Sequence, residues 1–309
     1  MDALSPYIEL ANSMMIEATL ASVALVELDE KEIAAFSHEG QHYGVAFDLF
    51  KEAAGCVCIL ASTTVGSKAT WDVEQAVLGG HLVRMFKLMR FVLGESMENR
   101  ADLLSVLIRL LAECVINLRY LIVNRSKELI DSYVAYSLQH EKELADVIQS
   151  NIGARRGVEL PIERRMLNSI AKTFENSCFS ESSLPPKKIR NWGGKNLYER
   201  AAAVELGDAY LAIFGGPSRN VHGGWQDLLQ FHLECVGPGE FKPDLEFSRP
   251  RPQPIYSLTH LISETVAGYA TSLEHEELAP VISRLEDLNE RNQIASDLHE
   301  QFLIAKRVG

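Results

Sequence analysis

One apolar segment of the chain carries polar residues at every fourth position, and these residues could bind an anion. The segment runs from Ala101 to Val123, and the polar positions are Ser105, Arg109, Glu113 and Asn117. In a helix, each four-residue step turns by about 40°, so the four side chains form one slanting stripe. If the stripe is buried, an ion pair between Arg109 and Glu113 is nearly obligatory. The stripe then predicts an anion clamp, in which Arg109 binds the anion and Glu113 orients it.

A second group of polar residues surrounds a glycine-rich turn. The segment WGGKNLYERAAAVELGDAYLAIFGGPSRNVHGGWQDLLQ contains Trp192, Tyr210, Ser218, Arg219, His222 and Trp225. Ser218 and His222 are four residues apart and share a face if this stretch is helical. A histidine beside arginine, serine and two glycines is a candidate for acid–base chemistry. The alternative is a structural histidine.

The two groups together resemble a bacterial family of all-helical proteins known only as a domain of unknown function. The resemblance rests on LLSVLIRLLAECVINLRYLI, an R-x-x-x-E pattern, followed by W…Y…S-x-x-x-H-G, and it extends over about residues 41–229. By position it assigns Arg109, Glu113, Trp192, Tyr210, Ser218, His222 and Gly223 to the family pattern. The sequence departs from that pattern at Phe214, where a second tyrosine is usual, and at the break Gly215-Gly216-Pro217. The family has no established reaction, so the resemblance implies a helical fold and site residues only.

By analogy, the fold is similar to the HEPN helical bundles, many of which are metal-independent ribonucleases in toxin and phage-defence systems. Those enzymes carry R-x(4–6)-H on one helix, whereas only two residues separate Arg219 from His222 here. Arg109 and His222 could form an equivalent pair across two helices. The imidazole would then act as general base or acid at a ribose 2′-OH, and the guanidinium would stabilise charge on the phosphate.

The leading hypothesis is therefore a nucleic-acid- or nucleotide-directed defence factor with ribonuclease chemistry and no cofactor. Its catalytic residues would be Arg109, Glu113, Ser218 and His222. Its substrate contacts would be Trp192, Tyr210, Arg219 and Gly223. The alternative is a non-catalytic helical interaction module, in which both groups of residues are structural.

A short motif near the N-terminus offers a third reading, zinc hydrolysis. His38-Glu39-Gly40-Gln41-His42 fits H-E-x-x-H, in which two histidines bind zinc and the glutamate activates water. Gly40 weakens the helix that this motif needs, and Gly44 stands one residue early for the usual glycine turn. We therefore expect no metal at His38 and His42.

Charge is distributed unevenly along the chain. The net charge is −12, which argues against a general nucleic-acid coat. The segment 154–195, however, contains nine Lys and Arg against four Glu, a local net charge of +5. It could contact RNA or a nucleotide, or it could be an ordinary solvated surface.

Apolar residues recur at the helical period along most of the chain, which predicts an all-α helical bundle with additional helices. We expect helices at about 5–28, 33–59, 71–93, 101–123, 127–150, 196–214, 257–274 and 280–306. The segment 101–123 is apolar on nearly every side and is expected to be the central helix. Residues 151–192 are less regular, and no segment has the pattern of a strand.

Five of the eleven prolines lie between Gly237 and Pro254, which predicts an extended connector. The expected organisation is a bundle domain at 1–236, a Pro-rich connector at 237–256 and C-terminal helices at 257–309. The last helix has a narrow apolar stripe, so these helices could pack on the body or on a second subunit of a homo-oligomer.

Composition points to a cytoplasmic protein that does not enter the membrane. The first residues, MDALSPYIELANSMM, lack the basic and apolar regions of a secretory signal. The longest apolar stretch, 103–123, contains Arg109, Glu113 and Arg119, which would be very costly in hydrocarbon. Five cysteines at scattered spacings are typical of free thiols in a reducing compartment.

Overall fold

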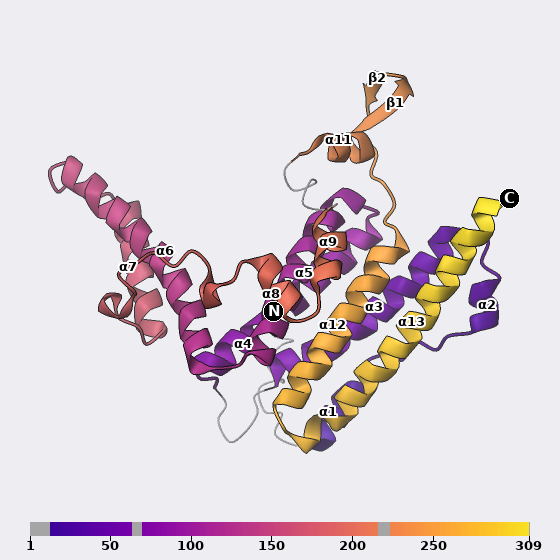
Figure 1. Cartoon of the computed structure of the whole chain (residues 1–309), viewed down its shortest axis with the longest axis horizontal. Coiled ribbons are helices and arrows are strands. Elements are labelled where there is room, and N and C mark those ends of the chain that lie inside the picture. Colours follow the sequence, from indigo (N-terminus) through magenta and orange to yellow (C-terminus); the bar gives the residue numbers. More distant parts are fainter. Residues whose placement is uncertain (1–12, 64–69, 216–222, 309) are drawn as a thin grey trace. The chain divides into compact units, whose positions relative to one another are not determined.

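The computed structural model describes residues 13–63, 70–215 and 223–308 (Figure 1). The chain divides into two compact units. The first unit comprises Met1–Ile122 and Ala201–Gly309, and the second comprises Val123–Arg200. Within the described ranges the elements are helices, apart from one two-stranded hairpin, so the prediction of an all-α protein is confirmed.

The first unit is built from both ends of the chain. Its helices before the second unit are α1 (Ser13–Ala21), α2 (Glu30–Ala34), α3 (Glu39–Ser62), α4 (Val73–Met97) and α5 (Ala101–Val123, which ends at the boundary). The elements that follow are α8 (Leu197–Ala203, which crosses the boundary), α9 (Gly207–Gly215), α11 (Trp225–Phe231), β1 (Leu233–Gly237), β2 (Glu240–Pro243), α12 (Pro252–Ser272), the 3-10 turn η4 (Glu276–Leu278) and α13 (Ala279–Val308).

The core of this unit forms around α3. This helix packs closely on α1, α4, α12 and α13, and it runs beside α12 and α13 (Figure 1). Its buried face contains small residues, among them Ala46, Ala53, Ala54 and Cys56, which let neighbouring helices approach closely. The central position expected for α5 therefore belongs to α3. Helix α5 is deeply buried, but its buried face is made largely of Leu and Ile, which keep neighbouring backbones farther away.

A buried carboxylate joins α3 to α13. The Glu52 side chain accepts hydrogen bonds from Arg291 Nη2 at 2.8 Å, from Arg291 Nη1 at 2.9 Å and from the Val26 N–H at 2.9 Å. Arg284 on α13 donates to the same carboxylate. Burial alone would raise the pKa of Glu52, but these donors hold it below its ordinary value. The chain segment before α2 is thereby attached to both helices.

The hairpin and α7 (Pro161–Asn176) form where irregular chain was expected. The hairpin turn contains Pro238 and Gly239, and Gly239 has a φ of +79°. Proline followed by glycine with positive φ favours a tight turn, so the residues that predicted a connector instead reverse the chain. In α7, Pro161 stands in the first turn, where its missing N–H costs nothing. Proline marks the start of that helix.

The second unit is a helical hairpin of α6 (Lys127–Ala154) and α7, followed by the 3-10 turns η2 (Glu181–Ser183) and η3 (Trp192–Gly194). Its core contains Leu138, Ile148, Ile170 and Phe174. The connection between the helices includes Gly157, with a φ of +85°. The unit therefore has a small apolar core of its own.

Two adjacent glycines in α4 test how closely this helix of the first unit packs on the Trp71 ring. A Cβ on Gly79 would lie 2.7–2.9 Å from the Trp71 ring, whereas one on Gly80 would meet nothing within 4 Å. We expect Gly80→Ala to stabilise the protein by about 0.5–1 kcal/mol, since alanine restricts the unfolded chain. Gly79→Ala should instead destabilise it by about 1–2 kcal/mol, because the ring must move. Urea unfolding measures both, and equal effects at the two positions would contradict this packing.

No helix in the described ranges is both long and apolar enough to span a bilayer.

Candidate functional site

The polar stripe on α5 divides into buried and half-buried members. Ser105 and Asn117 are buried, and Ser105 Oγ donates to the Asp102 carbonyl at 2.7 Å. Arg109 and Glu113 are half-buried. No Arg109–Glu113 pair is found among the ion pairs of the described residues, so the expected buried ion pair is not formed. Half-buried charges remain partly hydrated, so Arg109 and Glu113 need not pair with each other.

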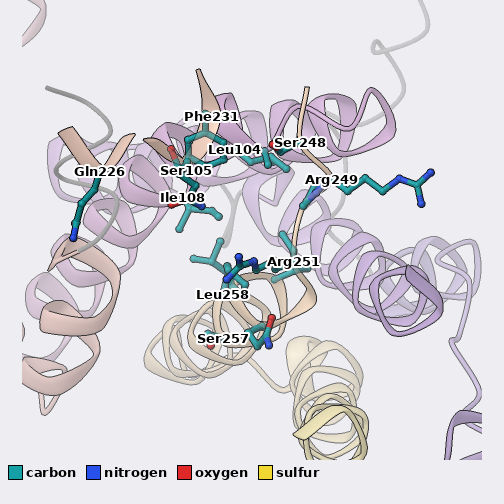
Figure 2. A pocket seen from close by; sticks show the side chains of 16 residues that line it. Leu104, Ser105, Ile108, Gln226, Phe231, Ser248, Arg249, Arg251, Ser257 and Leu258 are labelled. Carbon is teal, nitrogen blue, oxygen red and sulfur yellow. The ribbon is translucent and has the colours of Figure 1, made fainter. Parts of the chain in front are cut away.

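A cavity of about 490 Å³ lies against this helix within the first unit. It is bounded by α5, by α11, and by residues 248–251 with the first two turns of α12 (Figure 2). The Ala101 N–H donates to the Ser248 carbonyl at 3.1 Å, which attaches this segment to the start of α5. Farther along α5, Arg119 pairs with Glu264 of α12 at 2.7 Å. A hydrogen bond and an ion pair therefore hold α5 to the two neighbouring parts of the cavity wall, the segment 248–251 and α12.

The lining combines apolar walls, polar groups and two cations. The uncharged polar side chains are Ser105, Gln226, Gln230, Ser248, Gln253 and Ser257. Arg249 and Arg251 also line the cavity, and no Asp or Glu does among the described residues. Figure 2 shows Arg251 near the centre of the view, between Ile108 and Leu258, while Arg249 extends to one side. In a chain of net charge −12, the lining of this cavity is therefore locally positive.

The α5 stripe turns gradually away from the cavity. Ser105 and Ile108 line it. From the helical period, Arg109 lies roughly 90° around the axis from the middle of the lining face, and Glu113 roughly 130°. Neither residue is among the described residues that line the cavity, although Arg109 lies nearer to the lining face than Glu113 does.

The other candidate residues have different surroundings. Tyr210 is half-buried on α9. Gly223 has a φ of +59°, a left-handed conformation that favours glycine at this position of the motif. Ser218, Arg219 and His222 lie outside the described residues.

Trp192 belongs to the second unit and has a packing role there. It is buried, with the Arg200 guanidinium 4.0 Å from the centre of a ring and the Tyr133 ring at 5.1 Å. The adjacent Gly193 N–H donates to Ser132 Oγ at 2.9 Å. These contacts hold the 3-10 turn η3 on α6.

The H-E-x-x-H segment lies at the start of α3. His38 precedes the helix, whereas His42 is fully buried against the rings of Phe36, His299 and Phe302, with ring centroids 4.8–5.1 Å away. Burial, with His299 nearby, lowers the pKa of His42 to about 4, although Glu39 opposes the shift. Across the described part of the chain, no three His, Cys, Asp or Glu side chains are grouped to hold a metal ion.

A buried cysteine and histidine also lie together between α4 and α5. Cys114 Sγ is 3.5 Å from His81 Nδ1 and donates to the His81 carbonyl at 3.2 Å. Burial raises the pKa of Cys114 to about 12, which Glu113 reinforces and Arg84 opposes. A protonated, buried thiol is a poor nucleophile, so this contact is part of the core.

The basic segment 154–195 is partly neutralised by its own unit. Arg155 pairs with Glu163, Arg164 with Glu159 at 2.8 Å, and Lys188 with Glu143 at 2.7 Å. Six other basic residues are exposed and form no ion pair within the described chain: Arg156, Arg165, Lys172, Lys187, Arg190 and Lys195. The surface of this unit therefore keeps an excess of positive charge.

The described residues form a helical fold with one hairpin, and its first unit contains a cavity whose lining includes two arginines. The model of a family of unknown function (DUF5677) matches residues 75–240, more than half of the chain, and the protein belongs to this family. The resemblance to an uncharacterised helical family is thereby confirmed. No curated protein and no solved structure matches the chain.

The family match includes α5, α11 and the candidate residues of the R-x-x-x-E and W…Y…S-x-x-x-H-G patterns, but it begins after the H-E-x-x-H segment and ends before Arg249 and Arg251. Sequence reasoning did not identify these arginines or Gln253. Their only signal is the run Arg-Pro-Arg-Pro-Gln-Pro at 249–254, which places cations beside stiff proline residues.

Proposed function

We propose that the protein is a nucleic-acid- or nucleotide-directed factor that binds a phosphate group in the cavity between α5, α11 and α12. The observation that carries this proposal is a cavity whose described lining residues include two arginines and no carboxylate. Neither arginine pairs with an acid in the described chain, so binding an anion requires no ion pair to be broken. Guanidinium groups match the geometry of phosphate oxygens well.

Metal-independent cleavage of RNA is the reaction that the candidate residues support. His222 would accept the proton of a ribose 2′-OH while that oxygen attacks the adjacent phosphorus. The P–O5′ bond then breaks, water supplies a proton to the leaving 5′ oxygen, and a 2′,3′-cyclic phosphate forms. Arg109 would stabilise the charge that develops on the phosphate.

Chain connectivity supports the participation of His222. Gln226 lines the cavity and follows His222 by four residues. Four residues span at most about 14 Å even when fully extended. This closeness in the sequence supports a role for His222 at the cavity.

The second unit favours a polynucleotide as the ligand. Six exposed basic side chains that are not neutralised could contact successive phosphates of an RNA strand. Binding through this surface should weaken steeply as salt concentration rises, because each phosphate contact releases counterions.

The test is cleavage of a mixed RNA pool in the presence of EDTA. We expect the wild type to cleave it, and His222→Ala to lose about 10²–10⁴-fold in rate, the usual contribution of general acid–base catalysis. Arg109→Lys should also lose activity, because lysine presents a single point charge. His275→Ala is the control, since His275 is exposed and lies away from the cavity lining. A wild type that neither binds nor cleaves RNA would contradict the proposal.

A second candidate function is a non-catalytic interaction module, including self-association. The observation that favours it is exposed apolar surface between β2 and α12, where Leu245 is 90% exposed and Phe247 is 55% exposed. Sedimentation velocity over a range of concentrations tests self-association. A dimer that persists in Leu245→Asp would place the contact elsewhere, for example on the C-terminal helices.

A further inference from the structure

The cavity lining contains apolar side chains that an anion alone would not contact favourably. Leu104 and Ile108 of α5, Phe231 of α11, and Ile255 and Leu258 of α12 form apolar walls around the arginines. A phosphate alone gains nothing from such walls, because it is strongly hydrated. A ligand that carries both a phosphate and a flat apolar ring would use the whole lining.

The amide groups define the hydrogen bonds that this ring must make. Gln226, Gln230 and Gln253 all line the cavity. Gln253 Oε1 is buried and accepts no hydrogen bond within the described chain. A buried acceptor without a donor is unfavourable, so this oxygen fits a ligand that presents an N–H group.

The position of Gln253 brings the amide for the ring close to the cation for the phosphate. It lies two residues after Arg251, in the first turn of α12, where the positive end of the helix dipole also favours an anion. A phosphate at Arg251 would therefore place the attached nucleoside within reach of the Gln253 amide.

We propose that the cavity holds an adenine base whose attached phosphate lies at Arg251. A glutamine amide can accept a hydrogen bond from adenine N6–H and donate one to N7. Phe231 and the leucines would contact the faces of the ring, since bases stack readily on aromatic side chains. This inference rests on the proposed function and specifies the nucleotide that the site selects.

The experiment is isothermal titration calorimetry of the full chain with AMP, GMP, CMP, UMP and inorganic phosphate. We expect AMP to bind at least tenfold more tightly than the other nucleotides and than inorganic phosphate. A five-residue oligoadenylate and oligouridylate distinguish the two sources of the base: tighter binding of oligoadenylate than of AMP identifies an RNA strand, and equal binding identifies a free nucleotide. Either of these results supports an adenine site.

Two variants separate the role of the Gln253 amide from that of the Arg251 guanidinium. Gln253→Met keeps the size of the side chain and should remove the preference for AMP while leaving phosphate binding intact. Gln293→Met is its control, because Gln293 lies on α13 and pairs with Asp297. Arg251→Met should weaken all ligands about equally and retain the order of the bases, so the proposal stays testable if one variant fails to fold.

The outcomes distinguish this inference from the proposed function. Nucleotides that bind no better than inorganic phosphate, or a Gln253→Met protein with unchanged base preference, would overturn the adenine site alone. If phosphate, nucleotides and oligonucleotides all fail to bind, the proposed function fails as well.

Discussion

Glu52→Ala is expected to lower the free energy of unfolding by about 3–5 kcal/mol, the usual cost of removing one partner from a buried ion pair. The carboxylate is fully buried and accepts hydrogen bonds from Arg284, Arg291 and the Val26 N–H. Its removal leaves two largely buried guanidinium groups and one backbone donor without their acceptor. Chemical denaturation followed by circular dichroism measures the change.

A matched control removes a different partner of the same arginine. Asp287 pairs with Arg291 at 2.8 Å, but its side chain is 53% exposed. Asp287→Ala should therefore cost no more than about 1 kcal/mol, as solvent-exposed ion pairs generally do. Equal losses of unfolding free energy in the two variants would contradict this expectation, because they would show that the buried carboxylate stabilises the fold no more than the exposed one does.

Stability should also fall as the solution is acidified from about pH 6.5 towards pH 4. Burial lowers the pKa of His42 and of His81 to about 4, with His299 adding to the shift at His42 and Arg84 at His81. In this range the unfolded chain takes up protons that the folded chain excludes, so protonation favours unfolding. The stabilisation is complete above pH 6.5, and each histidine should account for a loss of about 1–3 kcal/mol by pH 4.

Unfolding curves measured at half-unit pH intervals test this expectation. The pKa of Glu52 is also lowered, but its contribution is lost only below its unfolded value of 4.5, so it does not affect the profile above pH 5. His42→Phe should flatten the profile between pH 5 and 6.5, whereas His275→Phe, at an exposed position, should not. Parallel profiles for the wild type and His42→Phe would contradict a neutral, buried imidazole.

The helices that could be predicted are those whose boundaries depend on local chemistry. The α5 helix spans the predicted residues, because an uninterrupted apolar pattern specifies it. At the start of α4, the Asp72 carboxylate accepts from the Gln75 N–H, and the Gln75 side chain accepts from the Asp72 N–H. Such caps are visible in sequence.

The features that could not be predicted depend on contacts between distant segments. The central role of α3 follows from close packing of small residues against α12 and α13, which local periodicity does not reveal. The hairpin was missed because proline and glycine are common to turns and to connectors alike.

The candidate site was anticipated only on its α5 side. Ser105 lines the cavity, and Arg109 lies beside that face. The predicted Arg109–Glu113 pair was wrong because both side chains are half-buried. Arg251 and Gln253 could not be assigned, since the cavity exists only where α5, α11 and α12 meet.

Construction of the first unit from both ends of the chain has a consequence for its synthesis on the ribosome. Helix α3 ends at Ser62, and two of the helices that cover it, α12 and α13, begin only at Pro252 and Ala279. At about 5–20 residues per second, the face of α3 that packs on α12 and α13 stays uncovered for at least roughly 10–40 s while the intervening chain is made. The second unit, whose helices α6 and α7 are adjacent in sequence, can fold during that interval. Until α12 and α13 emerge, the nascent chain therefore carries one folded unit and a helix with part of its apolar face uncovered, a state in which a chaperone would find its substrate.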